Sequence, residues 1–538
     1  MSEAAVAIDA GPVPGARPQL DHKAPVAGAI LFFGLLAAGV LYIAYGLSTD
    51  MGEAGTSPLA IGAFVLLGLS LLIALGFEFV NGFHDTANAV ATVIYTHAMP
   101  ANLAVVYSGC LNLLGVVTSS GTVAFAIISL LPVELILQVG SNAGFAMIFS
   151  LLIAAIFWNL GTWSLGIPNS SSHTLVGSII GVGLANQLMS PAGTVTSGVD
   201  WNQAANVFRA LLFSPVVGFV GSALLLLVMK FLVRKPSLYV APDTSKAPPS
   251  WIRGLLILTC GSVSFAHGSN DGQKGMGLLM LILIGAMPTA YALNRATPTP
   301  NVTVFVQAME QTNSVLQHHG VIQNVTPEAA RQAVENAIRT RDFSDPAVDA
   351  GLAGLARDIA GQVGSYGAIN KVPAAAVQNV RNEMYIASEA VRLMPKDRYN
   401  ADEKQVFATF KSQLDAGTRY IPFWVKVSVA IALGLGTMVG WKRIVVTVGE
   451  KIGKAHLTYG QGAAAEMIAA GTIMAADIYG LPVSTTHVLS SGVAGTMAAN
   501  GSGLQWSTVR SLAMAWVLTL PAAILISGSL YWVFRTIL

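Results

Sequence analysis

The sequence predicts an all-α, polytopic membrane protein, and its composition leads to that fold class. The chain has 538 residues, of which 53% are hydrophobic and only 10% are charged, and its mean hydropathy is +0.61. Soluble domains carry about 25% charged residues. This chain therefore cannot cover itself with a water-facing surface, and an ordinary soluble enzyme is excluded. The net charge of +2 gives no reason to expect a nucleic-acid partner.

Apolar runs of membrane-spanning length recur along the chain, since about 20 apolar residues cross a bilayer core as a helix. The first run follows a Pro-rich segment and is too long for a cleavable signal peptide. Spanning or nearly spanning runs lie at 26–46, 58–80, 102–118, 144–165, 205–232, 253–290 with an interruption, 421–441, 460–479 and 511–534. Three shorter runs, at 121–132, 173–188 and 487–500, predict half-helices or re-entrant arms.

The charged residues are concentrated in one block and in two short loops. Between Arg295 and Arg419 lie 26 of the chain's 56 charged residues, 13 of each sign. This block predicts a net-neutral aqueous insert. Basic loops face the cytoplasm, and two of them bracket the insert from the opposite side, so we expect the insert outside. Their residues are Lys230, Arg234, Lys235, Lys246 and Arg253, and then Lys442, Arg443, Lys451 and Lys454.

Two pairs of motifs recur and indicate a duplicated unit. NGFHDTANA at 81–89 aligns with HGSNDGQKG at 267–275, an offset of 186. GIPNSSSH at 166–173 aligns with GLPVSTTH at 480–487, an offset of 314. The expected topology makes the two copies inverted, and inverted repeats with helices broken at matching places are typical of secondary transporters.

These repeats divide the chain into four parts. We expect a cytoplasmic tail at 1–25, the first repeat and the start of the second at 26–290, a periplasmic insert at 291–420, and the rest of the second repeat at 421–538. The predicted architecture is two inverted repeats with broken helices and two re-entrant hairpins, plus the polar insert.

The residues at the repeats favour a site for a small oxyanion and a cation. Asp85 and Asp271 lie within apolar surroundings, where ionisable groups usually mark a substrate or ion pathway. A Gly-x-x-Asp sequence can open the helix at this point. The opened turn frees backbone carbonyls to bind a cation and backbone N–H groups to bind an anion. The triplets Ser170–Ser172 and Ser484–Thr486 each follow a Gly-x-Pro turn. This pattern predicts a helix N-terminus at each triplet, and a helix N-terminus favours binding of an anion. Carboxylates nearby would require protons, Na⁺ or a metal for charge balance.

The four motifs closely resemble those of the inorganic phosphate transporter (Pit) family, especially its bacterial low-affinity members. The resemblance extends to GLGTMVGWKRIVVTVGEKIGK and covers nearly the whole membrane domain. It implies import of phosphate, alone or as a metal–phosphate complex, by symport with H⁺ or Na⁺ across the bacterial inner membrane. It implies that phosphate contacts both Ser/Thr motifs and both Asp motifs. The phosphate-binding residues that we expect there are Asp85, Asn88, Ser170, Ser171, Ser172, Asn270, Asp271, Lys274, Ser484, Thr485 and Thr486. We expect cation or proton coupling at Asp85, His84, Asp271 and Asn81.

Two departures from the family pattern favour protons as the coupling ion. His84 stands where Asn is usual, and Lys274 replaces the last Asn of the second copy. A fixed ammonium can hold the position that Na⁺ fills in sodium-coupled relatives. We expect no catalytic residue, resident metal or cofactor, and phosphate and membrane lipid as partners. A homodimer and a sodium-coupled symporter stay open.

Each motif also has a structural alternative. In the first alternative, the Ser/Thr triplets cap the helix ends and have no further role. In the second, the two aspartates are structural groups paired with a buried cation. Glu78, Glu466 and Asp477 can be structural or neighbours of the site. The competing functional classes are an intramembrane phosphatase or transferase and a phosphate-sensing receptor. The duplicated triplets argue against an enzyme, because a hydrolase needs one asymmetric pair of nucleophile and base.

Overall fold

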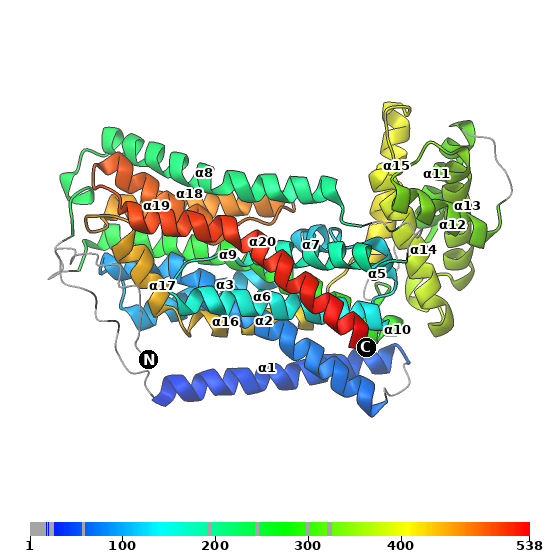
Figure 1. The fold of residues 1–538 in the computed structure, drawn as a ribbon, viewed down its shortest axis with the longest axis horizontal. Helices are drawn as coiled ribbons and strands as arrows, with labels where there is room; N and C mark the ends of the chain where they lie inside the picture. The colour runs from blue at the N-terminus through cyan, green and yellow to red at the C-terminus, as the bar shows by residue number, and fades with distance from the viewer. Residues whose placement is uncertain are drawn as a thin grey trace.

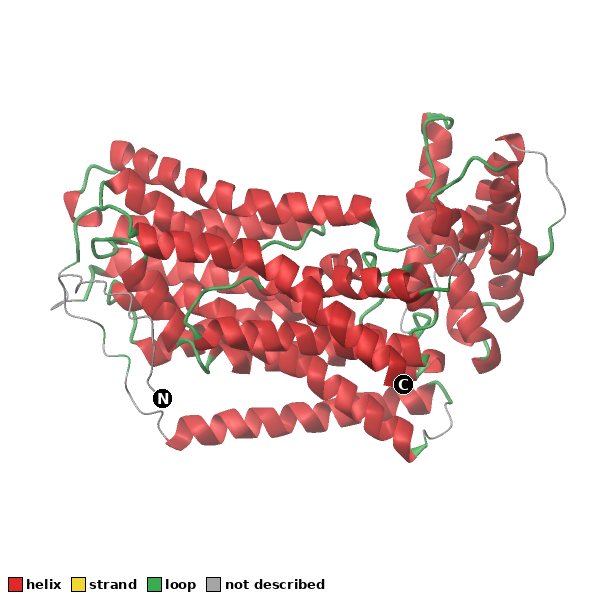
Figure 2. Ribbon diagram, viewed as in Figure 1, coloured by secondary structure: helices red, strands yellow, loops and turns green. Residues whose placement is uncertain are grey.

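The computed structural model describes residues 18, 20, 26–55, 60–191, 196, 198–242, 247–295, 302–319 and 325–537, without the side chains of 86–88. Within these ranges the chain forms helices and no strand (Figure 2). The all-α prediction is therefore confirmed for the described part of the chain. Most of the predicted N-terminal tail, at 1–25, lies outside the described residues.

The helices follow the predicted apolar runs closely. Those outside the insert are α1 (Val26–Glu53), α2 (Ile61–Tyr95), α3 (Ala101–Thr118), α4 (Thr122–Ile128), α5 (Val133–Leu137), α6 (Asn142–Ser164), α7 (Ser171–Met189), α8 (Trp201–Leu232), η1 (Pro236–Leu238), α9 (Ser250–Ala286), α10 (Pro288–Tyr291), α16 (Phe423–Thr437), α17 (Lys442–Val446), η3 (Thr447–Lys451), α18 (Tyr459–Ile478), α19 (Thr485–Asn500) and α20 (Trp506–Ile537). Those of the insert are α11 (Val302–His319), α12 (Pro327–Thr340), α13 (Pro346–Tyr366), η2 (Ile369–Lys371), α14 (Ala374–Leu393) and α15 (Ala401–Thr418).

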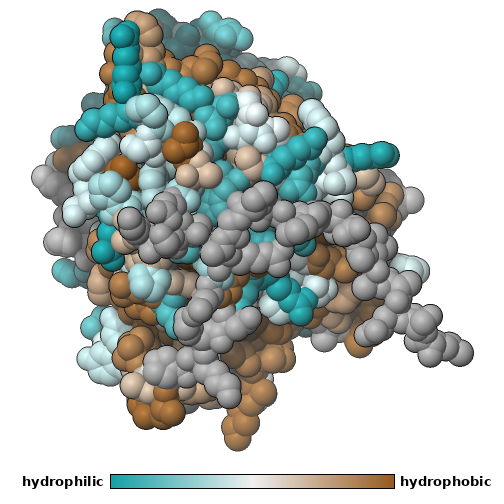
Figure 3. Space-filling model, turned by 90° about the vertical axis from the view of Figure 1, so that its left-hand side faces the viewer, coloured by the Kyte–Doolittle hydropathy of each residue, from teal (hydrophilic) through white to brown (hydrophobic). Residues whose placement is uncertain are grey.

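The insert forms a helical group at one end of a bundle of long helices (Figure 1). Helix α1 begins at the opposite end, where α17 also lies (Figure 1). We call these two ends the insert end and the basic-loop end. Hydrophilic residues cover much of the basic-loop end, while apolar residues gather on the flanks (Figure 3).

Lipid-facing character is clearest on the outer helices. Large apolar side chains are exposed along α1, α8 and α20, among them Leu41, Phe231 and Val517. In the described residues, six helices are long and apolar enough to cross a membrane, or seven when the bent pair α15–α16 is counted as one span. Exposed apolar area of this kind is stable in hydrocarbon rather than in water.

The structure corrects the prediction that two helices are broken at the aspartates. Helices α2 and α9 run without a break past Asp85 and Asp271, so the predicted helix breaks at the two aspartates are wrong. The glycines of these motifs serve packing instead. A Cβ at Gly82 would lie 2.2 Å from the carbonyl oxygen of Leu433, and one at Gly268 would lie 2.1 Å from that of Asn112.

The turns that precede α7 and α19, at 166–170 and 480–484, lie with these helices in what we call the two hairpins. The two turns lie toward opposite ends of the bundle. Gly166, before α7, lies against Arg443 and Thr447 at the basic-loop end. Gly480, before α19, lies against Thr122 and lines a cavity shared with the insert. This placement agrees with an inverted arrangement, although the repeat relation itself stays a prediction.

Candidate functional site

Two hairpins and two long helices meet at Asp85, which lies in α2 with 4% of its surface exposed. Its Oδ2 accepts a hydrogen bond of 2.7 Å from Ser171 Oγ, at the start of α7. Its Oδ1 accepts a hydrogen bond from Thr486 Oγ1, near the start of α19. One carboxylate therefore ties together both predicted hairpins, whose motifs are 314 residues apart in sequence.

Asp271 and Lys274 form the second charged element of the site, one turn apart on α9. Lys274 Nζ lies 2.6 Å from Asp271 Oδ2, and both side chains are at most 1% exposed. Ser171 Oγ also lies 3.4 Å from that oxygen, so Ser171 bridges the two aspartates. The other oxygen of Asp271 has no hydrogen-bond partner among the described residues. The ammonium thus neutralises Asp271 and leaves capacity for a ligand.

Two histidines flank the aspartates. Nδ1 of His84 lies 3.6 Å from Asp85 Oδ1. Nε2 of His267 lies 3.5 Å from Asp271 Oδ2 and 3.9 Å from Asp85 Oδ2. Its Nδ1 is 2.7 Å from Asn112 Oδ1, which indicates that this nitrogen carries the hydrogen. His267 therefore presents its Nε2 to both carboxylates.

The helix starts at the Ser/Thr triplets are confirmed, and the structure separates the roles of their members. Ser170 and Ser484 accept from the backbone N–H of His173 and His487, so they are N-caps of α7 and α19. These caps agree with the structural alternative for these two hydroxyls, while their contact with phosphate stays a prediction. Ser172 Oγ donates to the carbonyl of Val483 at 2.7 Å and joins one hairpin to the other.

The remaining predicted residues lie around this centre. Asn270 holds the second hairpin, since its Nδ2 donates to the carbonyl of Leu481 at 3.1 Å. Asn81 donates to Glu78 at 3.3 Å rather than to either aspartate. Thr485 Oγ1 is buried without a hydrogen-bond partner in the described part of the chain. The side chain of Asn88 lies outside the described residues.

A small cavity of about 10 Å³ lies beside this cluster, and Asp85, His267 and Thr485 line it. It has the size of a single water site. The unpartnered hydroxyl of Thr485 and the carboxylate of Asp85 both border it. The cluster is therefore closed in this conformation, with unused hydrogen-bonding groups at its centre.

Ligand atoms of Asp85, His267 and Asp271 lie within 4.8 Å of one another, which is close enough to hold a cation. The ammonium of Lys274 contacts the same oxygen of Asp271 as His267 Nε2 does. A cation at this place would therefore have to compete with Lys274.

Sequence reasoning missed several residues of the site. The sequence assigns no role to His267, although it lies in the second Asp motif, one turn before Asp271, and so shares its helix face. Asn112 gave no signal, because a lone polar residue in an apolar run has many explanations. Glu78, expected as a structural residue or a neighbour of the site, lies seven residues before Asp85 and therefore on the same face of the helix.

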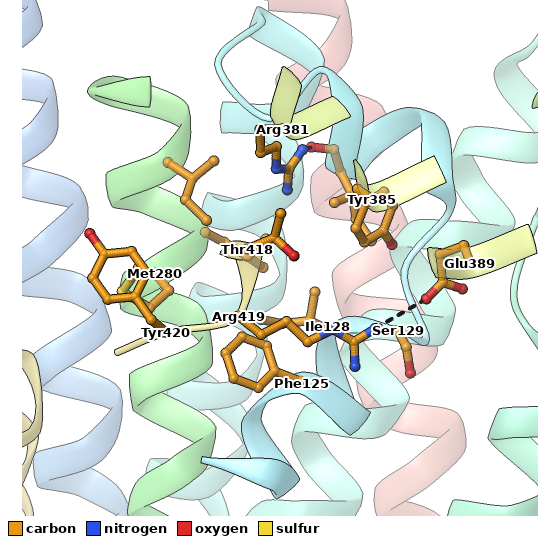
Figure 4. Close-up of a pocket in the computed structure, with 13 residues that line it drawn as sticks. Phe125, Ile128, Ser129, Met280, Arg381, Tyr385, Glu389, Thr418, Arg419 and Tyr420 are labelled. Carbon is orange, nitrogen blue, oxygen red and sulfur yellow. Dashed lines mark hydrogen bonds and ion pairs between the residues drawn. The ribbon is translucent and has the colours of Figure 1, made fainter. Parts of the chain in front are cut away.

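Cavities at the insert end connect the surface with the bundle. A cavity of about 960 Å³ lies between α4, α8, α15 and the turn at Gly480, and Arg209, Arg392 and Arg419 line it. A smaller cavity beneath α14 shares Arg419 with it. There Arg381 and Tyr385 lie on one side and Phe125 on the other, and Arg419 pairs with Glu389 at 3.5 Å (Figure 4).

The comparisons with known proteins agree with this arrangement. The family model described as "Phosphate transporter family" matches residues 81–527. The chain is 42% identical over 494 residues to the low-affinity inorganic phosphate transporter PitA of Escherichia coli (strain K12), covering 86% of this chain and 96% of that protein. It is 40% identical to PitB of the same organism over 495 residues, covering 88% and 98%.

More distant relatives cover the chain equally well. The probable low-affinity inorganic phosphate transporter of Bacillus subtilis (strain 168) is 27% identical and covers 88% of this chain and 99% of that protein. The solved structure titled "The sodium-dependent phosphate transporter" is 21% identical, covers 88% of this chain and all of that chain, and has a TM-score of 0.49. A likeness this distant does not bear on the coupling ion.

The fold and the buried site define a multi-pass membrane transporter rather than an enzyme. The chain belongs to the phosphate transporter family, as its motifs indicated. It is an integral protein of the bacterial inner membrane.

Proposed function

We propose that this chain imports inorganic phosphate together with protons by alternating access. The observation that carries the proposal is the convergence of both hairpins on Asp85, next to the ion pair of Lys274 and Asp271. Hydroxyl groups at two helix N-termini suit an oxyanion. The low-affinity phosphate transporters of Escherichia coli, similar over most of this chain, support phosphate as the substrate.

Lys274 is the reason to favour protons over Na⁺. Its ammonium lies at an oxygen of Asp271 that a coupling cation would use, and it cannot leave with the substrate as Na⁺ does. Coupling then requires a group that gains and loses a proton. His84, Asp85 and Asp271 are the candidates from the sequence, since an unperturbed imidazole has a pKa of about 6.5.

Uptake by purified protein in proteoliposomes tests the proposal. The H⁺ and Na⁺ gradients are imposed independently, and labelled phosphate is counted inside. We expect accumulation driven by the H⁺ gradient without Na⁺. A saturable Na⁺ requirement at constant pH would contradict proton coupling and support the sodium-coupled alternative. Absence of uptake under either gradient would contradict transport itself.

The same assay addresses the form of the substrate. The low-affinity type also accepts soluble metal–phosphate complexes, as the family resemblance implies. We propose that phosphate enters here both as the free ion and with a divalent cation. Uptake of phosphate and of Mg²⁺ is measured in the same vesicles. We expect phosphate uptake without Mg²⁺, and entry of Mg²⁺ together with phosphate when Mg²⁺ is added.

The orientation of the insert needs its own test. We propose that residues 291–420 are periplasmic. In a variant that lacks Cys110 and Cys260, a cysteine at the exposed Ser344 should react with an impermeant maleimide added to spheroplasts. The matched control is a cysteine at exposed Ser507, at the start of α20. The reverse labelling pattern would invert the topology.

A further inference from the structure

Glu78 is a buried carboxyl group of α2. Its surface is 0% exposed. Its Oε2 accepts a hydrogen bond of 3.3 Å from Asn81, and its Oε1 has no hydrogen-bond partner among the described residues. An ionisable group buried at membrane depth is costly, and such groups are typical of ion and proton pathways.

Its position relates it directly to the site. Glu78 precedes Asp85 by seven residues, which is two turns and about 10 Å along the helix, on the same face. Helix α2 runs from the insert end, because Asp50, at the end of α1, bonds Trp424 beside the insert. Glu78 therefore lies on the insert side of Asp85.

The side chain of Glu78 is accommodated by α9 next to Lys274. A Cβ added at Gly275 would lie 2.3 Å from Glu78 Cγ and 2.6 Å from Oε1, so glycine leaves room for the present position of this carboxyl group. The charged groups of α9 that act on it are Lys274 and Asp271. Two carboxyl groups thus share the neighbourhood of one ammonium.

The other helices packed against α2 near Glu78 differ in their ionisable residues. Helix α6 contains no ionisable residue. Helix α16 contains Lys426, whose ammonium donates to the carbonyl of Ser119 at 2.7 Å. Helix α3 contributes Tyr107, which donates to Ile257, and the exposed Cys110.

Helices α18 and α19 meet α2 on the far side of Asp85 from Glu78. Thr486 of α19 bonds Asp85, and Glu466 of α18 accepts a hydrogen bond from Thr92. The other oxygen of Glu466 accepts from Thr259 at 2.5 Å. Unlike Glu78, this second buried carboxyl group has both oxygens engaged.

The charges decide which carboxyl group holds a proton. Asp85 accepts two hydroxyl hydrogen bonds, which suits an ionised carboxylate. Asp271 is paired with Lys274. Glu78 has no salt bridge among the described residues, and its Oε1 has no side-chain donor, so burial disfavours its charged form.

We infer that Glu78 is a proton-binding site of the transport cycle, a role that rests on the proposed proton-coupled phosphate import. The proton binds the carboxylate of Glu78 from the insert end. While Lys274 pairs with Asp271, Glu78 keeps its proton. When the ammonium turns to Glu78, the carboxylate becomes stable and the proton leaves toward the basic-loop end.

The test compares Glu78→Gln with Glu78→Asp in proteoliposomes. Two activities are measured: accumulation of phosphate driven by an H⁺ gradient, and exchange of internal for external phosphate without a gradient. Glutamine keeps the shape of a protonated carboxyl group but binds no proton. We expect Glu78→Gln to retain exchange, lose accumulation, and lose the pH dependence of exchange. Glu78→Asp should keep coupling with a shifted pH midpoint.

The outcomes separate this inference from the proposed function. Accumulation by Glu78→Gln with the pH profile of the wild type would overturn the role of Glu78, even though phosphate transport would stand. Absence of exchange in the wild type would instead contradict the proposed function. If Glu78→Gln does not fold, Glu78→Asp decides: an unchanged pH midpoint overturns the inference, and a shifted one supports it.

Discussion

The centre of the bundle and the joint between bundle and insert are both rich in charged groups, but they satisfy them differently. At the joint, Asp200 Oδ1 caps α8 through the N–H of Gln203, and its Oδ2 accepts from Arg392 at 2.6 Å. Glu389 accepts from Arg392 and from Arg419. In the centre, by contrast, Asp271 and Glu78 each keep one oxygen without a hydrogen-bond partner among the described residues.

This difference teaches which charges hold the fold and which are available for a ligand. A buried polar group left unpaired costs about 1–3 kcal/mol. Asp200 and Glu389 at the joint already have partners for both oxygens, so a movement would bring them no further hydrogen bond. Their pairs with arginines of the insert hold the insert against α8. The unpaired oxygens of the centre can gain partners when phosphate or a proton arrives.

The largest effect should come from removing a central carboxylate. Asp85→Asn and Asp271→Asn should each reduce phosphate uptake about a hundredfold or more, because two charge-assisted hydrogen bonds of ~1.5–3 kcal/mol are weakened. Expression and thermal stability should stay near those of the wild type. Uptake at the wild-type rate by either variant would show that its aspartate is structural.

Replacing the fixed ammonium should have the next largest effect. Lys274→Asn removes the partner of Asp271 at 2.6 Å and should reduce proton-driven uptake about tenfold. It should also create a dependence on Na⁺ by opening the cation position at Asp85, His267 and Asp271. Phosphate uptake is measured against Na⁺ concentration at constant pH. Proton-driven uptake unchanged in this variant would contradict the role given to Lys274.

A change at the joint should affect stability rather than transport. Burial opposes ionisation of Asp200, but the Arg392 ion pair outweighs it and holds the pKa of Asp200 below the ordinary 3.8. Its contribution is therefore complete above pH 3.8 and is lost as the pH falls through the lowered pKa. Asp200→Asn should reduce the free energy of unfolding by about 2 kcal/mol at neutral pH.

Thermal unfolding of the full chain in detergent measures the loss at Asp200, and proteoliposome uptake is the companion readout. Strong loss of uptake with unchanged stability would mean that the joint takes part in transport. That result would remove the contrast between the two regions.

The smallest effects should separate neighbouring hydroxyls within one triplet. Ser170→Ala removes an N-cap and should cost ~1 kcal/mol of stability with little change in the KM for phosphate. Ser171→Ala removes the bridge between the two aspartates and should raise KM about fivefold, equivalent to ~1 kcal/mol, with stability nearly unchanged. If both variants change the same quantity, the two hydroxyls do not have separate roles.

The sequence predicts some parts of this site well for physical reasons. A Gly-x-Pro turn followed by Ser and Thr leaves few options other than a helix N-terminus, and α7 and α19 begin there. The paired motifs also predicted that residues far apart in sequence would meet. Ser171 and Thr486 do meet, at Asp85.

Other parts could not be predicted because they depend on packing between helices. A glycine near an aspartate is compatible with an opened helix or with a close helix crossing, and at Gly82 the crossing is observed. Likewise, the pairing of Lys274 with Asp271 rather than with Asp85 depends on which rotamer the neighbouring helices allow. Sequence spacing alone does not contain that information.

The contact between Glu78 and Gly275 also constrains the order in which this site can have evolved. Because a Cβ at position 275 would lie 2.3 Å from Glu78 Cγ, the glutamate keeps its present rotamer only where glycine is present. The glycine, in turn, is compatible with a smaller residue at 78. An ancestral sequence could therefore acquire Gly275 first and Glu78 second without an unfolded intermediate, whereas the reverse order passes through a clash.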